Sequence, residues 1–422
     1  MLDIQRIRNE TDAVKRGLAT TGADPAVIDA VLELDAVRRE LQREGDALRG
    51  ELNARSKQIG CEKDKERRAA LIADVGDLKR RIKENEARVP DVERELDTIM
   101  LAIPNVPLAE VPTGPDDSAN VIESVSGAPP VLAFEPKPHW ELMERLGIID
   151  FERGQKISGS RFYILKGDGA RLQRALITFM LDVHTKQHGY EEIYPPCMVR
   201  SECLVGTGNL PKFGEHLYHD AEEDYWFVPT AEVPVTNLYR DEILDGEKLP
   251  IRHVAYTPCF RREKMSHGKD TRGIKRGHQF DKVEVVQFVH PDKARAALDE
   301  LIGHATRILD LLGLHHRRVK MCTGDLSFVS CIKFDLEVWA PGCKEWLEVS
   351  SCSLFGDFQA RRARIRFRDE SGKNRFVNTL NGSGLALPRT LIAVVESYQD
   401  DDGSIRIPEV LRPYMGGQDR IG

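Results

Sequence analysis

The segment Phe260–Glu284, FRREKMSHGKDTRGIKRGHQFDKVE, predicts a strand, a polar loop and a second strand that together form a hairpin. Arg261 and Glu263 lie two residues apart, so we expect them on one face of the first strand. By the same spacing, Phe280 and Glu284 share a face of the second strand. The loop between the strands contains glycine and many charges.

The positive charge of this hairpin suits a polyanionic ligand. Arg261 and Arg276 would converge on one such ligand, and the ring of Phe280 offers a surface on which a flat base can stack. Arginine suits this task because its planar guanidinium binds two phosphate oxygens at once. The alternative interpretation is an exposed hairpin tip whose charges are solvated.

The chain as a whole limits the class of protein. Its 422 residues suffice for two or three domains, and its net charge of −7 means that any basic surface must be local. We expect a cytoplasmic protein without a membrane partner, because no signal segment is visible and no apolar run approaches the ~20 residues of a membrane span. The 8 cysteines form no CxxC pair and none of the 12 histidines completes a zinc-like spacing, so reduced thiols and no zinc are expected.

The region 29–103 is rich in charge and poor in aromatic residues. From Leu71 to Ile103, apolar residues recur at alternating steps of three and four, and Asn85 fills one polar slot. This period near 3.5 predicts a coiled-coil seam. Pro90 lies within the pattern and predicts a kink.

The preceding stretch from Leu34 to Ile59 shows the same alternation, with gaps at Gly45 and Arg55. Because Gly60–Glu66 predicts a turn, two helices of about 30 residues would fold into an antiparallel arm roughly 45 Å long. Three functions fit this pattern: a dimerisation coiled coil, a spacer with a solvated charged face, or a device that reaches along a phosphate backbone. The arginines that would serve the third function are Arg38, Arg39, Arg43, Arg67, Arg68, Arg80 and Arg81.

The rest of the chain predicts an α+β domain. Residues 104–138 carry many prolines and no periodicity, which indicates a linker. Beyond them, RFYILKG, YWFVP, HVAYTPCF and KVEVVQFV are rich in aromatic and β-branched residues and predict strands. Ala170–His188 and Asp292–Leu312 predict helices. Since strands and helices do not alternate regularly, we expect a mainly antiparallel sheet flanked by helices.

Two further stretches bring carboxylates and hydroxyls together. Glu348 and Ser351, in EVSSCSLFGDFQARR, offer the oxygen ligands that Mg²⁺ takes when it bridges substrate phosphates. The alternative is a buried acid paired with a later arginine. Thr230 and Glu232, in VPTAEVPVTNLYRDEI, are expected on an extended segment that holds the ammonium group of an amino acid. An isolated pair of this type would more often lie on a surface strand.

A glycine-rich turn precedes a predicted helix near the C-terminus. Gly382 and Gly384 in NTLNGSGLALPRTLIAVVESYQ would let the backbone approach a ligand closely, and Arg389 follows on the helix. The spacing matches neither a Walker loop nor a dinucleotide-binding fingerprint, so this stretch is weak evidence by itself.

The order of these stretches resembles that of class II aminoacyl-tRNA synthetases, and more closely that of the seryl-tRNA synthetase family. The resemblance runs from the arm to near the C-terminus. The stretches that carry it are HWELMERLGIIDFERGQKISGSRFYILKGDGARL, GTGNLPKF, PTAEVPVTNL, GKDTRGIKRGHQFDKVE, EVSSCSLFGDFQARR and NGSGLALPRTLIAVVESYQ.

The resemblance implies three parts: a helical tRNA-binding arm at 1–103, a linker at 104–138 and a class II catalytic domain at 139–422. GYEEIYPPCMV, at 189–199, resembles the segment that builds the dimer interface, so a homodimer is implied. The partners implied are L-serine, ATP and tRNA(Ser), whose long variable arm the family's helical arm grips. The family also charges tRNA(Sec) where that tRNA exists, which leaves it open as a second substrate.

The resemblance also assigns roles at the nucleotide. Arg261 would contact the α-phosphate and the serine carboxylate, Glu263 the adenine amino group, Arg276 the distal phosphates, and Phe280 would stack on adenine. Arg261 and Arg389 are the implied catalytic residues, and Glu348 and Ser351 would hold Mg²⁺ with ATP. The full implied ATP set is Arg261, Arg262, Glu263, Arg276, Phe280, Glu348, Val349, Ser350, Ser351 and Arg389. The implied serine set is Thr230, Ala231, Glu232, Arg261, Glu284 and Ser383.

Several positions depart from the family's pattern. Lys264 and Met265 stand where a small Ala-Gly pair is expected, and Leu354 stands where an asparagine is expected. Together with Pro90, they bear on tRNA docking more than on adenylation. Two rival functions remain: a related ligase that charges a carrier protein, and a catalytically silent relative that binds nucleotide or tRNA.

Overall fold

The computed structural model describes residues 1–264 and 272–422. Met265, one of the departures noted above, lies outside the described residues. The chain divides into two compact units. One contains Leu2–Ala19 and Ala23–Pro104, and the other contains Asn105–Gly422 with Met1 and Thr20–Gly22.

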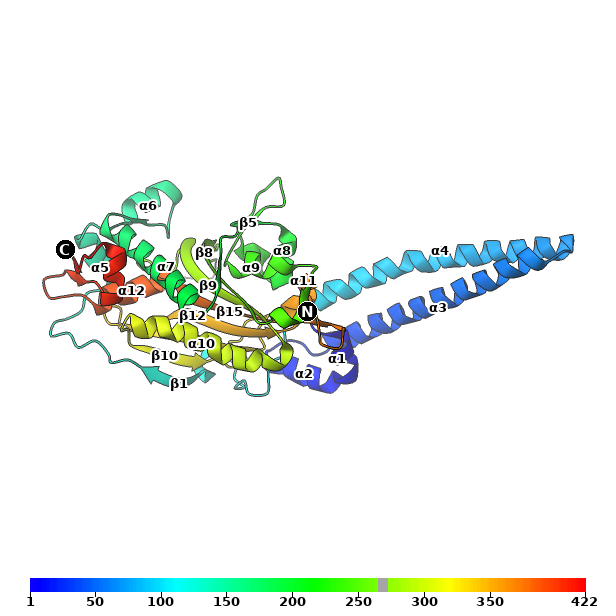
Figure 1. The fold of residues 1–422 in the computed structure, drawn as a ribbon, viewed down its shortest axis with the longest axis horizontal. Helices are drawn as coiled ribbons and strands as arrows, with labels where there is room; N and C mark the ends of the chain where they lie inside the picture. Colours follow the sequence, from blue (N-terminus) through cyan, green and yellow to red (C-terminus); the bar gives the residue numbers. More distant parts are fainter. Residues whose placement is uncertain (265–271) are drawn as a thin grey trace. The chain divides into compact units, whose positions relative to one another are not determined.

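The first unit is helical, and its two long helices run side by side (Figure 1). Its elements are α1 (Ile4–Asn9), α2 (Thr11–Thr20), α3 (Val27–Cys61) and α4 (Lys65–Ala102). Asp64 caps α4 by accepting hydrogen bonds from the backbone N–H groups of Glu66 and Arg67. The predicted antiparallel arm is therefore confirmed, with helices of 35 and 38 residues that exceed the expected length.

The arm is held by a narrow apolar seam with one polar layer. Leu48, Leu78 and Ile82 are buried against one another. The gap at Gly45 has a packing reason, because a Cβ there would lie 3.0 Å from Oδ1 of the buried Asn85. The helix α4 continues across Pro90, whose ring is exposed, although proline removes one backbone hydrogen bond there.

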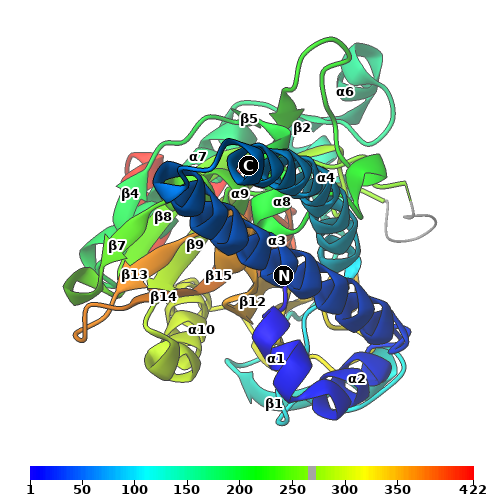
Figure 2. The same cartoon turned by 90° about the vertical axis from the view of Figure 1, so that its right-hand side faces the viewer.

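The second unit is built on an eight-stranded sheet, several of whose central strands lie side by side in Figure 2. Among the described residues, its neighbouring strands pair antiparallel except for the parallel pair β4–β8. The strands in spatial order are β1 (Val121–Ser126), β10 (His316–Lys320), β11 (Ile332–Ala340), β12 (Glu345–Gly356), β15 (Asn378–Ala386), β9 (Gln279–Val289), β8 (Ile251–Phe260) and β4 (Glu191–Ile193). This sheet confirms the predicted α+β class.

Helices cover the sheet unequally, and this leaves one region open for a site. On one face lie α7 (Asp168–Lys186), α10 (Ala294–Leu311) and α12 (Leu387–Ser397). On the other face, α9 (Glu232–Thr236) and α11 (Phe358–Ala363) pack beside a core that includes Val286 and Phe288 of β9.

Gly382 and Gly384 lie within β15, so the expectation of a glycine-rich turn was wrong. A Cβ at Gly382 would lie 2.5 Å from Cδ2 of Leu301 on α10, and one at Gly384 would lie 2.6 Å from Nε2 of His184 on α7. These glycines therefore let helices pack closely on the back of the sheet.

Smaller elements surround this sheet. The helices are α5 (His139–Arg145), α6 (Phe151–Ser158) and α8 (Ser201–Thr207). The short strands are β2 (Ile149–Asp150), β3 (Ile164–Leu165), β5 (Met198–Val199), β6 (Trp226–Phe227), β7 (Ile243–Asp245), β13 (Arg366–Arg368), β14 (Asn374–Phe376), β16 (Ile405–Arg406) and β17 (Arg420–Ile421). The stretches RFYILKG and YWFVP thus form only two-residue strands. Among the described residues, no helix combines the length and apolarity needed to cross a bilayer.

The segment 104–138 holds more structure than a linker pattern predicts. It contributes β1 as an edge strand of the large sheet, paired with β10. Near its start, the side-chain amide of Asn105 donates to the carbonyls of Val329 and Phe355 at 2.9 and 2.8 Å. The residues of β1 are mostly exposed on both faces, so apolar and polar residues do not alternate clearly along it. Its sequence therefore contains no clear strand signal.

Candidate active site

The basic hairpin is present as β8 and β9, but its first strand ends earlier than expected. β8 stops at Phe260, and beyond it the backbone N–H of Arg261 donates across the hairpin to the carbonyl of His278 at 2.9 Å. Glu263 has a φ of +43°, in the left-handed region. Arg261 and Glu263 therefore do not share the face of a strand, and the turn after β8 directs both side chains to the same cavity.

A cavity of ≈ 650 Å³ brings most of the predicted site together. Its size is in the range of small-molecule and nucleotide sites. Eleven of the residues predicted from the sequence line it: Thr230, Glu232, Arg261, Glu263, Arg276, Phe280, Glu348, Val349, Ser351, Ser383 and Arg389.

Four predicted site residues do not line this cavity. Ala231 is buried in the apolar cluster beneath α9, and the guanidinium of Arg262 lies over the ring of Tyr218 at 5.7 Å. Ser350 faces away and donates to the carbonyl of Ser383 at 2.7 Å. Glu284 is fully buried one layer behind the cavity wall. Because their side chains do not line the cavity, these four residues could act on a ligand only through their backbone atoms or through a neighbouring residue that does line it.

Cationic side chains gather at one part of the cavity. The Arg261 guanidinium lies 5.1 Å from the ring centroid of Phe280. Arg276 faces the Glu263 carboxylate at 3.5 Å, and Arg389 donates to the backbone carbonyl of Glu348 at 2.8 Å. Arginines held in place beside an open cavity suit the oxygens of a polyphosphate.

A β-bulge explains how Glu348 and Ser351, three residues apart, both reach the cavity. Glu348 pairs with Glu337 and Ser350 pairs with Leu336, which leaves Val349 as an extra residue in β12. The bulge moves Glu348 to the face that carries Ser351 and Ser353, because side chains otherwise alternate along a strand. The sequence pattern shows the two residues but contains no sign of the bulge.

The electrostatic surroundings keep Glu348 ready to bind a cation. Burial opposes its ionisation, yet the positive charges of Lys333 and Arg389 outweigh burial and hold the pKa of Glu348 below its ordinary value. The neighbouring Asp335 pairs with Lys333 at 3.2 Å. A carboxylate and a hydroxyl on one open face form an all-oxygen donor set, which is the kind that Mg²⁺ prefers.

The other part of the cavity is a compact polar pocket. The ammonium group of Lys282 donates to the Thr230 hydroxyl at 2.8 Å and lies 2.6 Å from the Glu284 carboxylate. The amide of Asn381 donates to Glu284 at 2.7 Å and to Glu232 at 2.9 Å. Thr230 and Glu232 were expected on an extended segment, which is wrong, since Glu232 is the first residue of α9. The helix start nevertheless aims both side chains into the pocket.

Sequence reasoning missed three polar residues of this pocket. Lys282 was counted only as part of a charged stretch, although its spacing from Phe280 and Glu284 places it on the same strand face. Asn381 lies two residues before Ser383 on β15, and this spacing likewise places the two side chains on one strand face. Gln359 donates to Glu232 at 2.6 Å from α11, and nothing in the local pattern could reveal it.

The titration of Glu232 provides a first test of this pocket. Burial raises the pKa of Glu232 to about 7, and the negative charge of Glu284 adds to the effect. Because the pKa is higher in the folded state than the ordinary 4.5, this group costs stability as pH rises from about 4.5 through 7. We expect E232Q to unfold at higher urea than the wild type at pH 8, and to lose this advantage at pH 5. The difference should reach a few kcal/mol at most, since one pKa unit corresponds to about 1.4 kcal/mol. Identical stability profiles of the two proteins would contradict the assignment.

Two departures from the expected pattern are placed by the structure. Leu354 is buried in the main apolar core and pairs across the sheet with Leu380 and Ile332, so it does not line the cavity. Lys264 does line the cavity, and its ammonium group lies 3.5 Å from Glu215.

Comparisons with known proteins agree with this geometry at the level of the class. Residues 215–398 match the family model of the tRNA synthetase class II core domain (G, H, P, S and T). This range contains the hairpin, the bulged strand and the arginine helix described above. A solved prolyl-tRNA synthetase from Giardia lamblia has the same fold over 65% of this chain, with a TM-score of 0.56 and 14% identity.

Full-length comparisons narrow the class to one family. Residues 1–107 match the seryl-tRNA synthetase N-terminal domain. The chain is 56% identical over 423 residues to a serine--tRNA ligase of Thermomicrobium roseum, covering 100% of this chain and 95% of that one. A crystal structure of seryl-tRNA synthetase from Pyrococcus horikoshii complexed with ATP matches with a TM-score of 0.94 and 37% identity, covering 100% and 99%. The chain belongs to the seryl-tRNA synthetase family, which confirms the resemblance seen in the sequence.

Proposed function

We propose that this protein is a serine–tRNA ligase, which activates L-serine with ATP to seryl-adenylate and then transfers serine to tRNA(Ser). One observation carries the proposal. A single cavity joins a cluster of arginines, suited to a triphosphate, to a compact polar pocket that Glu232 lines and the buried Glu284 backs, suited to a small amino acid. The family and its solved member complexed with ATP support this assignment.

The arginines would promote adenylation by neutralising charge. An oxygen of the serine carboxylate attacks the α-phosphorus of ATP, a new O–P bond forms, and the bond to pyrophosphate breaks on the opposite side. Both reactants are anions, so Arg261 would contact the carboxylate and the α-phosphate together, while Arg276 and Arg389 would serve the distal phosphates. All three arginines line the cavity. Phe280 would stack on adenine, and Glu263 would accept from its amino group.

Glu348 and Ser351 would hold Mg²⁺ with ATP, because their oxygens share the open face of β12 beside these arginines. Mg²⁺ bound there would offset the negative charge of the phosphates. The coupling of Glu348 to Lys333 and Arg389 keeps its carboxylate ionised for this purpose.

The polar pocket would select serine. Glu232 would accept from the ammonium group and Ser383 from the hydroxyl, while the buried Glu284 would act on the hydroxyl through Asn381, which lines the cavity and donates to Glu284. Alanine would leave these buried polar groups unpaired, and a site of this kind discriminates by ~10⁴–10⁵. Threonine would be excluded by lack of room.

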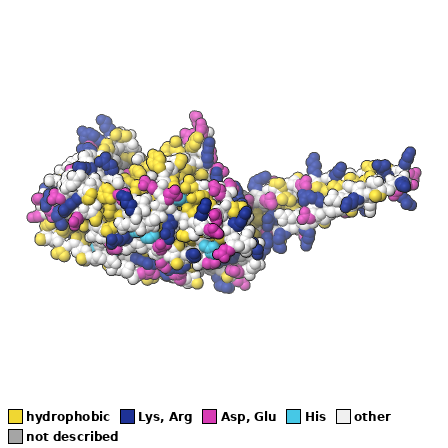
Figure 3. All heavy atoms as spheres, viewed as in Figure 1, with side chains coloured by type: hydrophobic (Ala, Val, Ile, Leu, Met, Phe, Trp, Pro, Cys, Tyr) yellow, Lys and Arg dark blue, Asp and Glu magenta, His cyan; other side chains and the backbone are white. Residues whose placement is uncertain are grey.

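The arm, dimer and location belong to the same proposal. We assign 1–103 as the tRNA-binding arm, 104–138 as a linker that also adds β1 to the large sheet, and 139–422 as the catalytic domain. Basic side chains occur along the visible face of the arm among acidic ones, which suits contact with a tRNA backbone (Figure 3). The family also implies a homodimer. Its support here is that β4 lies at an edge of the sheet and that the next residue, Tyr194, is 92% exposed and thus available to a second subunit. A cytoplasmic location, and tRNA(Sec) as a second substrate, follow from family likeness alone.

Two rival functions fit the structure less well. A ligase that charges a carrier protein would not need the long arm formed by α3 and α4. A silent relative that only binds nucleotide would not need an intact polar pocket next to the phosphate cluster. The rivals therefore predict different substrates for the same cavity.

Amino-acid-dependent exchange of pyrophosphate into ATP tests the proposal. We expect exchange with serine, and exchange with alanine reduced by at least ~10⁴ in kcat/KM. Equal exchange with serine, alanine and glycine would contradict the proposed pocket. No exchange with any of the 20 amino acids would favour the silent relative.

A further inference from the structure

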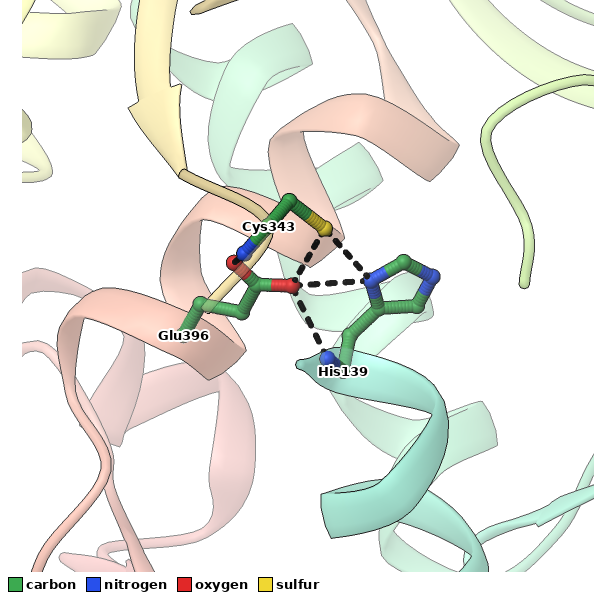
Figure 4. Close-up of side chains that lie close together, drawn as sticks. All are labelled: His139, Cys343 and Glu396. Carbon is green, nitrogen blue, oxygen red and sulfur yellow. Dashed lines mark hydrogen bonds and ion pairs between the residues drawn. The ribbon is translucent and has the colours of Figure 1, made fainter. Parts of the chain in front are cut away.

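A buried cluster beside the cavity has no part in the proposed chemistry. His139 is the first residue of α5, Glu396 lies near the end of α12, and Cys343 lies between β11 and β12 (Figure 4). The side chains of His139 and Glu396 have no exposed surface. Their ligand-type atoms and that of Cys343 all lie within 4.8 Å of one another.

The hydrogen bonds of this cluster determine which nitrogen of His139 carries a proton. One oxygen of Glu396 accepts from Nδ1 of His139 at 2.9 Å, from its backbone N–H at 2.8 Å and from the Cys343 thiol at 3.0 Å. The other oxygen accepts from the backbone N–H of Cys343 at 2.9 Å. Burial opposes ionisation of Glu396, but these donors outweigh it and hold its pKa below the ordinary value. Burial also lowers the pKa of His139, so the imidazole is neutral with its proton on Nδ1.

The free nitrogen of His139 then acts on the basic hairpin. Nε2 accepts a hydrogen bond at 3.2 Å from the backbone N–H of Ile274, two residues before Arg276. The preceding residue must be glycine for two reasons. Gly273 has a φ of +70°, and a Cβ there would lie 2.0 Å from Nε2 of His139.

Other contacts hold the same segment against the nucleotide site. The carbonyl of Lys275 accepts from Nε of Arg389 at 3.4 Å, and the ammonium group of Lys275 pairs with Glu345. Arg272 lies 4.5 Å from the ring centroid of Trp140, which follows His139 in the chain. The segment 272–276 is therefore attached to α5 on one side and to Arg389 on the other.

We propose that His139 is a positioning residue, which holds the Ile274 amide through Nε2 and so places Arg276 and Arg389 for the triphosphate. The inference rests on the proposed function for its catalytic consequence, while the contact itself does not depend on it. Nucleotide affinity would then depend on a hydrogen bond made by a residue that never touches ATP. Losing one such bond changes affinity by roughly tenfold.

A zinc site is the competing interpretation, because a histidine, a thiol and a carboxylate are zinc-type ligands. The two interpretations exclude each other. A metal on Nδ1 would move the proton to Nε2, and Nε2 would then face the Ile274 N–H as a second donor. The complete set of hydrogen bonds around Glu396 favours the positioning role.

Two substitutions at one position separate the two ring nitrogens. In H139N the amide nitrogen takes the place of Nδ1 and still donates to Glu396, but the side chain is too short to reach Ile274. In H139Q the amide oxygen reaches the place of Nε2 and can accept from Ile274. We expect H139N to raise the KM for ATP in serine-dependent exchange roughly tenfold with kcat less affected, and H139Q to stay within about threefold of the wild type.

Hydrogen–deuterium exchange of the full-length protein without ligands gives a readout that is independent of activity. The Ile274 amide should exchange at least about tenfold faster in H139N than in the wild type, and H139Q should restore most of the protection. If H139N fails to fold, G273A provides the same test, because its Cβ separates the segment from His139. C343S is the matched control, since serine still donates to Glu396 and the KM for ATP should not change.

Unchanged protection of the Ile274 amide in both H139N and G273A would overturn the inference. Equal losses of this protection in H139N and H139Q would overturn it as well. About one zinc per wild-type chain, lost in C343S, would overturn it in favour of a metal site. A wild-type protein without serine-dependent pyrophosphate exchange would refute the proposed function. The hydrogen–deuterium exchange of the Ile274 amide would still show whether the contact with His139 exists.

Discussion

R261A is expected to lose serine-dependent pyrophosphate exchange by about 10³-fold in kcat/KM, with little change in folding stability. Arg261 lines the cavity where the arginine cluster meets the polar pocket, and its guanidinium lies 5.1 Å from the centroid of Phe280. In the proposed reaction it would contact both anions, the serine carboxylate and the α-phosphate. Removing one group that stabilises developing charge costs ~10²–10³ in rate, and Arg261 would contact two such groups.

The neighbouring arginine makes a sharp comparison for this result. Arg262 has the same charge but lies over Tyr218, outside the cavity lining. We expect R262A to lose less than about tenfold in kcat/KM for serine-dependent exchange, although the family resemblance implied an ATP contact for Arg262. R261K should remain strongly impaired, because lysine cannot bind two oxygens in a planar fork. Exchange by R261A within tenfold of the wild type would remove Arg261 from the catalytic role.

E284Q is expected to reduce kcat/KM for serine by about 10²–10³ while the KM for ATP changes little. Glu284 accepts from Asn381 at 2.7 Å and pairs with Lys282 at 2.6 Å, and all three side chains are buried. Glutamine keeps the size of the side chain but leaves the charge of Lys282 without its partner, which is costly in a buried site. The substitution would also weaken the polar network through which Lys282 and Asn381 reach the cavity, and with it the proposed recognition of the serine hydroxyl.

D281N is the matched control for E284Q. Asp281 lies on the same strand, β9, and accepts from the Tyr256 hydroxyl at 3.0 Å on the opposite face from the pocket. It should alter stability without a selective effect on serine. Equal changes in the KM for serine and for ATP in E284Q would argue that Glu284 only supports the fold.

Much of the fold was predictable because its signals are local and periodic. The seam of the arm follows from apolar spacing, and the helices α7 and α10 differ from their predicted limits by at most two residues. The order of the motifs along the chain then indicated the family, which the comparisons confirm. What remained hidden was geometry that depends on neighbouring strands.

The bulge at Val349 illustrates this limit. Its position depends on pairing with β11, so no local pattern shows that Glu348 and Ser351 share a face. The left-handed φ of Glu263 is a second feature without a local signal, because any residue type near a site can be held in a strained backbone conformation by its surroundings. Gly382 and Gly384 were assigned to a ligand, but the atoms that demand them belong to Leu301 and His184 on distant helices. The contact of Gln359 with Glu232 was hidden too, because Gln359 lies on α11, far from Glu232 in the sequence.

Charging of a tRNA(Ser) transcript with labelled serine, ATP and Mg²⁺ by the full-length protein tests the central claim most directly. The account predicts that intact tRNA(Ser) is serylated, and that removing its long variable arm lowers kcat/KM roughly 100-fold, the loss expected when about 3 kcal/mol of binding is removed. Exchange of pyrophosphate should be the same in either case, since that step needs only the cavity. Failure to charge the intact tRNA, or equal charging without the variable arm, would contradict the account.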